Sequence, residues 1–88
     1  MDKKLEDKIN EKIRDAISGT SEIDALAKSM DSAKAGDKSF RYGVIVGRLY
    51  NSFYYQCRRI LKRDPTDGEF AEFVEILAKR RDEILKNL

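Results

Sequence analysis

Histidine and tryptophan are both absent from this 88-residue sequence, and cysteine and proline each occur once. Without histidine the chain lacks the commonest general base and metal ligand, so Ser–His and Cys–His nucleophilic arrangements cannot form. The single cysteine, Cys57, excludes an internal disulfide and a cysteine-based zinc site. No glycine-rich phosphate loop of the Walker or Rossmann type is present either. We therefore expect no enzymatic activity, no metal, no cofactor and no small-molecule substrate.

Long apolar segments are missing as well. No run approaches the roughly 18 apolar residues that a membrane-spanning helix needs, and the chain does not open on a signal-peptide segment. We therefore expect a cytoplasmic protein without a membrane partner. The length allows one domain, residues 1–88. Lysine, arginine and glutamate are abundant while asparagine and glutamine are scarce, a bias typical of thermophilic proteins.

Apolar residues recur at steps of three and four along most of the chain, and alternation with a period of two is absent. This pattern predicts helices over about 2–18, 22–34, 40–63 and 67–87 and no sheet. Ser21 with Asp24 resembles a capping box at the start of the second helix. The small, polar residues around Gly36 indicate a flexible connection between the second helix and the third.

The connection between the third and fourth helices has a specific pattern. Pro65 ends the third helix, and Thr66 with Glu69 forms a capping box that begins the fourth. The nearby Asp64 and Asp67 have the positions expected of residues that cap the fourth helix and pair with its dipole. The stretch has too few carboxylate ligands for a calcium-binding loop. The sequence thus predicts an all-α, compact three- or four-helix bundle built on a long antiparallel αα-hairpin (about 40–63 and 67–87) that supplies most of the core.

One side of helix 40–63 carries small and aromatic residues beside its core face. These residues are Gly43, Gly47, Tyr50 and Tyr54. Glycine in a helix interior is unfavourable by about 1 kcal/mol relative to alanine, so two glycines one turn apart suggest a closely approaching backbone. We favour an intrachain contact, in which another helix crosses here. The alternative is a homodimer that forms across this groove with the tyrosines at its edge. Cys57 lies near the core face, and we expect it to be buried and structural.

The distribution of charge gives a second functional indication. Residues 38–63 contain seven basic residues and no acidic one, although the whole chain has 18 basic and 16 acidic residues. In one interpretation, which we favour, these cations pair with the acidic faces of helices 2–18 and 67–87, within the bundle or between subunits, or are solvated. In the other, they bind the phosphates of a nucleic acid while a tyrosine stacks on a base. The residues concerned are Arg41, Arg48, Tyr55, Arg58, Arg59 and Lys62.

Two functional hypotheses follow from these surfaces. The first is a non-catalytic helical interaction or adaptor protein that self-associates, because helix 40–63 is apolar around much of its circumference. The alternative is a small nucleic-acid-binding accessory or regulatory protein that uses the basic face of the same helix. The expected partner is therefore another protein, a second copy of this chain, or a nucleic acid.

Overall fold

The computed structural model describes all 88 residues and is entirely helical outside its turns. The all-α prediction is confirmed, and no strand forms. No helix combines the length and the apolar character that crossing a membrane requires. The elements are α1 (Lys3–Ser18), α2 (Thr20–Met30), the short 3-10 helix η1 (Ser32–Lys34), α3 (Lys38–Leu61) and α4 (Asp67–Lys86).

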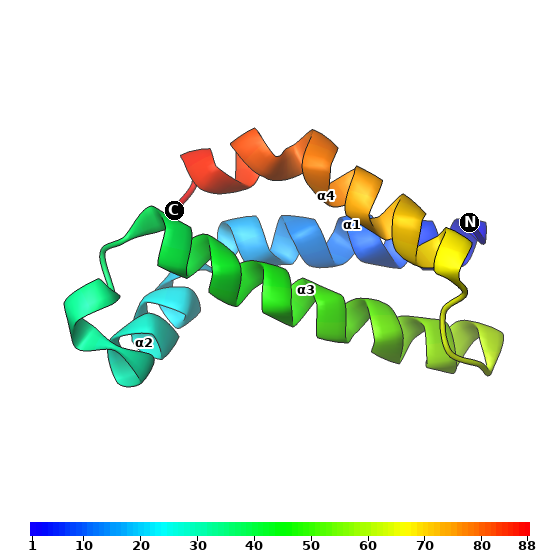
Figure 1. Ribbon diagram of the computed structural model, residues 1–88, viewed down its shortest axis with the longest axis horizontal. Coiled ribbons are helices and arrows are strands. Elements are labelled where there is room, and N and C mark those ends of the chain that lie inside the picture. The colour runs from blue at the N-terminus through cyan, green and yellow to red at the C-terminus, as the bar shows by residue number, and fades with distance from the viewer.

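Three long helices form an antiparallel bundle, and the short α2 lies beside one end of it (Figure 1). α3 runs opposite in direction to both α1 and α4, so the predicted α3–α4 hairpin is present. α1 packs most closely along α3, and α2 covers part of the N-terminal half of α3. The molecule measures 39 × 22 × 21 Å, so α3 extends over most of its length.

The hydrophobic core contains eleven buried residues, of which the α3–α4 hairpin supplies seven. Phe53 of α3 and Phe73 of α4 stack with their ring centroids 4.5 Å apart and form the centre of the hairpin. α1 contributes a narrow stripe that is nevertheless fully buried, because α3 and α4 enclose it from both sides. The core residues are Leu5, Ile9, Ile13, Ile23, Ile45, Leu49, Phe53, Cys57, Phe73, Leu77 and Ile84.

Side-chain caps determine where α3 and α4 begin. The Asp37 carboxylate accepts a hydrogen bond from the amide of Phe40, so α3 begins at Lys38, two residues earlier than predicted. α3 ends at Leu61 because Lys62 takes a left-handed conformation with φ of 62°. The predicted capping box of Thr66 and Glu69 is present at the start of α4, and both of its hydrogen bonds form.

The predicted capping box at Ser21 and Asp24 is wrong. α1 ends at Ser18 and α2 begins at Thr20, so Ser21 already lies in the first helical turn. Gly19 is the only residue between the two helices, and it supplies no side-chain cap. α2 also ends earlier than predicted, at Met30, and the following residues form η1 instead.

Candidate interaction surface

Gly43 and Gly47 lie on a part of α3 that no other helix of the chain covers. A methyl group added at either glycine would meet no atom within 4 Å. The favoured interpretation, in which another helix of the same chain crosses here, is therefore wrong. α1 and α4 pack against the buried side of α3, which carries Leu49 and Phe53. α2 packs against a different side of α3. Both glycines are exposed between these contacts.

An open apolar groove borders the two glycines at the N-terminal end of α3. Its walls are Met30 at the end of α2 and Phe40 and Val44 of α3, and its floor includes Gly43 and Gly47. The groove has a volume of about 560 Å³. Met30 is 63% exposed, so most of its apolar side chain is accessible beside the two glycines. We call this the α2 groove.

A second apolar groove lies at the other end of the same face of α3. Tyr54 and Pro65 border it, together with Phe70 and Val74 of α4, and its volume is about 490 Å³. Tyr50 lies between the two grooves, 43% exposed, and packs edge-on against Tyr54 and Phe70 with centroid separations of 5.4 and 5.8 Å. We call this second groove the α4 groove.

The spacing of the predicted strip residues places them on one side of α3. Gly43, Gly47, Tyr50 and Tyr54 follow one another at steps of four, three and four, the spacing of neighbours on a helix surface. The structure thus brings these four residues together as one continuous surface, with the α2 groove at one end and the α4 groove at the other. We call these four residues the α3 strip.

The predicted basic face is largely engaged within the chain. Arg41 forms an ion pair with Asp24 of α2, and Arg48 approaches Glu22 of α2 at 3.6 Å. Arg58 pairs with Asp64 at 2.5 Å just beyond the end of α3. The prediction that α1 and α4 supply the carboxylates is wrong for these three arginines, because two of their partners belong to α2 and the third to the turn after α3.

The remaining members of the basic face are exposed and make no ion pair. Tyr55 is 62% exposed, and Lys62 occupies the C-terminal cap of α3. Arg59 donates through Nε to the side-chain oxygen of Gln56 at 2.9 Å. The six predicted residues therefore do not act as one set: three arginines face carboxylates, and three residues face solvent.

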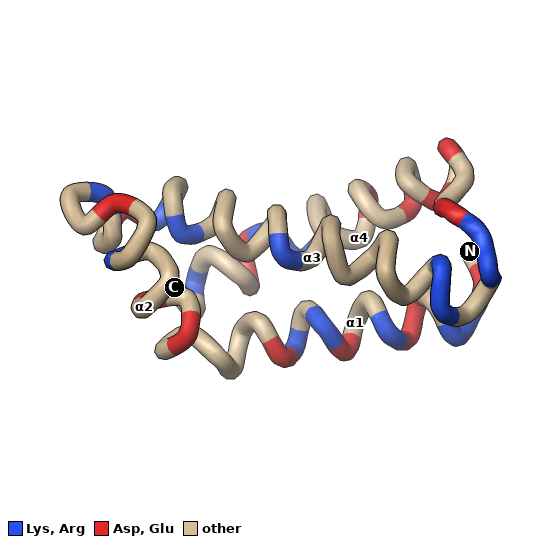
Figure 2. The backbone as a smooth tube through the Cα atoms, turned by 90° about the horizontal axis from the view of Figure 1, so that it is seen from below, with Lys and Arg blue, Asp and Glu red and all other residues tan.

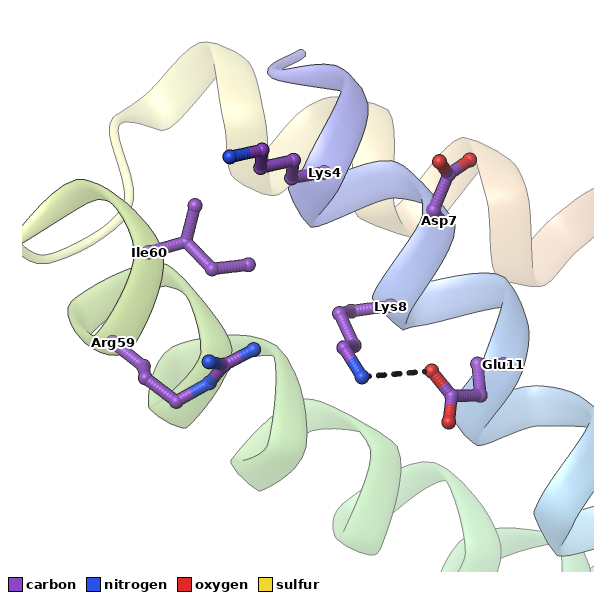
Figure 3. Close-up of a pocket in the computed structure, with 6 residues that line it drawn as sticks. All are labelled: Lys4, Asp7, Lys8, Glu11, Arg59 and Ile60. Carbon is purple, nitrogen blue, oxygen red and sulfur yellow. Dashed lines mark ion pairs between the residues drawn. The ribbon is translucent and has the colours of Figure 1, made fainter.

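A cleft between α1 and α3 joins the predicted Arg59 to two lysines, Lys4 and Lys8, that sequence reasoning missed. Lys4 and Lys8 extend from α1 toward α3, and Arg59 extends from α3 toward Lys8 (Figure 3). Ile60 lines the same cleft, which has a volume of about 380 Å³. Basic and acidic positions are interspersed along α1 (Figure 2), and its five basic residues against four acidic ones give no marked excess that would indicate the site. Only packing against α3 brings Arg59 to the two lysines.

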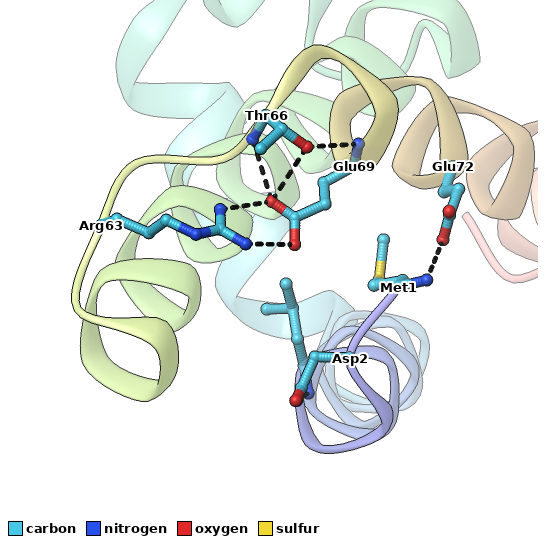
Figure 4. A network of polar contacts seen from close by, with 7 residues as sticks. Met1, Asp2, Arg63, Thr66, Glu69 and Glu72 are labelled. Atoms are coloured by element: carbon cyan, nitrogen blue, oxygen red, sulfur yellow. Dashed lines mark hydrogen bonds and ion pairs between the residues drawn. The ribbon is translucent and has the colours of Figure 1, made fainter.

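The turn between α3 and α4 contains a buried carboxylate (Figure 4). Glu69 is 9% exposed and accepts hydrogen bonds from the Arg63 guanidinium at 2.7 and 3.2 Å and from the Thr66 amide at 2.9 Å. Arg63, followed by the Thr66 amide, lowers the pKa of Glu69 to about 2. Nearby, the amino group of Met1 pairs with Glu72 at 2.8 Å. These contacts fix the hairpin, as the capping interpretation predicts.

The structure shows no cluster of metal-binding side chains and no exposed thiol. Cys57 is fully buried, and burial raises the pKa of its thiol, which disfavours the reactive thiolate. No three cysteine, aspartate or glutamate side chains come together in a way that could hold a metal ion. Comparisons with protein-family models, curated proteins and solved structures find no match to this chain. Its role is therefore inferred from its own surfaces.

Proposed function

We propose that this chain is a non-catalytic helical interaction protein that pairs with a second copy of itself through the α3 strip. The observation that carries the proposal is the exposure of Gly43 and Gly47 in the N-terminal half of a 24-residue helix. Each glycine disfavours the helix by about 1 kcal/mol relative to alanine. No contact within the chain uses the space that the missing side chains leave, whereas a second helix could approach closely there.

A two-fold arrangement of two chains suits the order of features along this face. The protruding Met30 lies at one end, and the α4 groove lies at the other, with the glycines between them. If two α3 helices cross in antiparallel directions between Gly47 and Tyr50, midway along α3 between the two grooves, Met30 of each copy faces the α4 groove of the other. The same surface then serves both copies, which is the requirement of a two-fold interface.

The size of the face also favours pairing along its full length. Each member of a standard protein–protein complex buries about 800 Å². The molecule exposes 5561 Å² in total, so an interface of this size would use about one seventh of its surface. A contact restricted to the α2 groove or to the α4 groove alone would be too small. Antiparallel pairing engages both grooves at once.

Sedimentation velocity over a range of protein concentrations tests the association directly. The wild-type chain is expected to change from monomer to dimer as concentration rises. Gly47→Leu places a branched side chain at the crossing point and should abolish the dimer. It should leave the monomer folded, because the glycine has open space around it. Ala25→Leu adds the same bulk to an exposed position of α2 outside the groove and should leave the dimer intact.

Complementary charges test the orientation of the two copies. Met30→Glu and Val74→Lys alter exposed side chains, so both variants should fold. Each variant alone should dimerise more weakly, and an equimolar mixture should regain the dimer, because Glu at position 30 then faces Lys at position 74 of the other copy. A monomeric wild type at high micromolar concentration would overturn the proposal. Failure of the mixture to associate would exclude the antiparallel arrangement.

The nucleic-acid alternative remains an untested prediction with reduced support. Arg41, Arg48 and Arg58 would have to leave their carboxylates before they could bind phosphates, which lowers the gain from each contact. Fluorescence anisotropy with duplex DNA and single-stranded RNA over a salt series checks it. A logarithmic slope of about −3 to −6 would indicate that several phosphates are neutralised and would favour this alternative.

A further inference from the structure

We infer that the cleft between α1 and α3 is a binding site for a phosphate group, held by Arg59 with Lys4 and Lys8. The three cations come from two helices and line one concave surface (Figure 3). Phosphate oxygens accept charge-assisted hydrogen bonds from guanidinium and ammonium groups, and arginine can supply two in parallel. This site shares no residue with the α3 strip, and it does not depend on the proposed self-association.

A buried side chain orients Arg59. Gln56 is only 7% exposed, and its side-chain oxygen accepts from Arg59 Nε at 2.9 Å. This hydrogen bond engages one edge of the guanidinium, so the Nη groups remain available and point toward Lys8 (Figure 3). A guanidinium that is already oriented loses less conformational entropy when it binds a ligand.

The carboxylates beside the cleft do not fill it. Asp7 pairs with Lys3 at 3.1 Å and points away from the cleft, whereas Glu11 pairs with Lys8 at 3.0 Å along one wall (Figure 3). Lys4 and Arg59 have no carboxylate within ion-pair distance. In Figure 3 the Lys8 ammonium lies nearer the Arg59 guanidinium, whereas the Lys4 ammonium points to the other side of the cleft. The cleft lining therefore has three cations against two carboxylates, and a bound phosphate group would offset the remaining positive charge.

The position of the cleft keeps it accessible when α3 pairs with a second copy. Arg59 lies roughly 120° around α3 from Gly47, at 100° per residue. Ile60 supplies an apolar wall beside the cations, and the cleft volume of about 380 Å³ exceeds the space that phosphate alone requires. A phosphate ester, in which the phosphate carries an organic group, therefore fits the cleft better than the inorganic ion does.

Titration with inorganic phosphate, adenosine monophosphate and a short single-stranded RNA, followed by ¹H–¹⁵N NMR at low salt, tests the site. We expect saturable shifts at Arg59 Nε and at the amides around Lys4 and Lys8, with a dissociation constant of about 0.1–1 mM for a solvent-exposed site of this kind. Tighter binding of the monophosphate would identify a small phosphate ester as the source. Tighter binding of the RNA at the same residues would identify a nucleic-acid backbone.

Three variants separate this site from non-specific attraction. Arg59→Gln should lower the association constant at least ten-fold while the rest of the spectrum stays unchanged. Gln56→Met retains the side-chain length but frees the guanidinium, and it should weaken binding about three-fold through lost orientation. Lys79→Gln removes an exposed cation of α4 that pairs with Glu75, so binding should stay within two-fold. Shifts that never saturate, or equal losses in the Arg59 and Lys79 variants, would overturn the inference.

Discussion

The two ends of α3 differ in how completely contacts within the chain bury and pair their side chains. At the C-terminal end, Phe53 stacks on Phe73, and Glu69 is buried with hydrogen bonds from Arg63 and Thr66. At the N-terminal end, α2 buries only two side chains and is otherwise tied to α3 by partly exposed ion pairs. The two glycines and Met30 lie uncovered beside it.

Under the proposed self-association, the stability of the monomer and the pairing of two copies depend on different groups along α3. The C-terminal end holds the bundle together without help from another molecule. The N-terminal end retains apolar surface and helix-disfavouring glycines that contribute nothing to the isolated chain. Changes to the buried groups at the C-terminal end should therefore alter unfolding most, and changes to the exposed side chains at the N-terminal end should alter association most.

The largest expected effect is at the C-terminal end. Phe53→Ala removes a ring that is 1% exposed and stacked in the core, so it should lower the free energy of unfolding by about 3–5 kcal/mol. Met30→Ala, at the N-terminal end, should change the free energy of unfolding by less than about 0.5 kcal/mol in dilute, monomeric protein. Urea denaturation monitored by circular dichroism measures both values. Similar losses in the two variants would remove the distinction between the ends.

The buried carboxylate at the turn should make this end sensitive to acid. The pKa of Glu69 is lowered to about 2 in the folded protein from 4.5, so its contribution is present above the unfolded pKa and disappears as the pH falls. Unfolding at pH 5 and at pH 2 should differ by about 3 kcal/mol from this group. Glu69→Gln should already lose most of that stability at pH 7 and show a flatter pH dependence.

The same type of substitution, glutamate to glutamine, at the N-terminal end of α3 provides the control for this titration. Glu22→Gln removes an exposed carboxylate whose distance to Arg48 is 3.6 Å. Exposed ion pairs of this kind contribute about 0–1 kcal/mol, so the variant should keep the wild-type pH dependence. An equally flattened profile would mean that the acid response does not come from the α3–α4 turn.

Alanine at the two glycines should change stability and association in opposite directions. Gly43→Ala with Gly47→Ala should stabilise the monomer by up to about 1 kcal/mol at each site, since the methyl groups meet no other atom. The dimer should weaken, because the helices can no longer approach as closely. Thermal unfolding and sedimentation velocity report the two effects. A less stable monomer would mean that another part of the chain uses this space.

The smallest predicted effect concerns the end of α3. Lys62 has a φ of 62°, which glycine adopts without the steric cost that other residues incur. Lys62→Gly should raise the free energy of unfolding by about 0.5–1 kcal/mol. Lys62→Ala, which keeps a Cβ atom, should give no such gain, and comparison of the two variants by urea denaturation isolates the backbone effect.

The sequence predicted the hairpin well because its signals are local. Pro65, Thr66 and Glu69 lie within five positions, and their capping pattern determines the turn whatever surrounds it. Helix periodicity likewise placed Phe53 and Leu49 in the core. The class of fold and the antiparallel pairing of α3 and α4 follow from these features alone.

The surfaces depended on contacts that the sequence does not encode locally. Whether another helix covers Gly43 and Gly47 is decided by where α2 docks, and α2 itself begins earlier than its cap-like residues suggested. The acidic residue that meets Arg41 is 17 positions away in sequence. The cationic cleft joins α1 to the end of α3, so neither helix reveals it separately.

The way α2 is attached has a consequence for motion. α2 buries Ile23 and Ala27, and its two ion pairs to α3 remain partly exposed to water. Its backbone amides should therefore exchange with deuterium through local opening, at a lower free energy than the amides of α3 around Phe53. Such opening would release α2 while the three long helices stay assembled. The area of α3 that is accessible to other molecules would then increase when α2 opens and decrease when it closes.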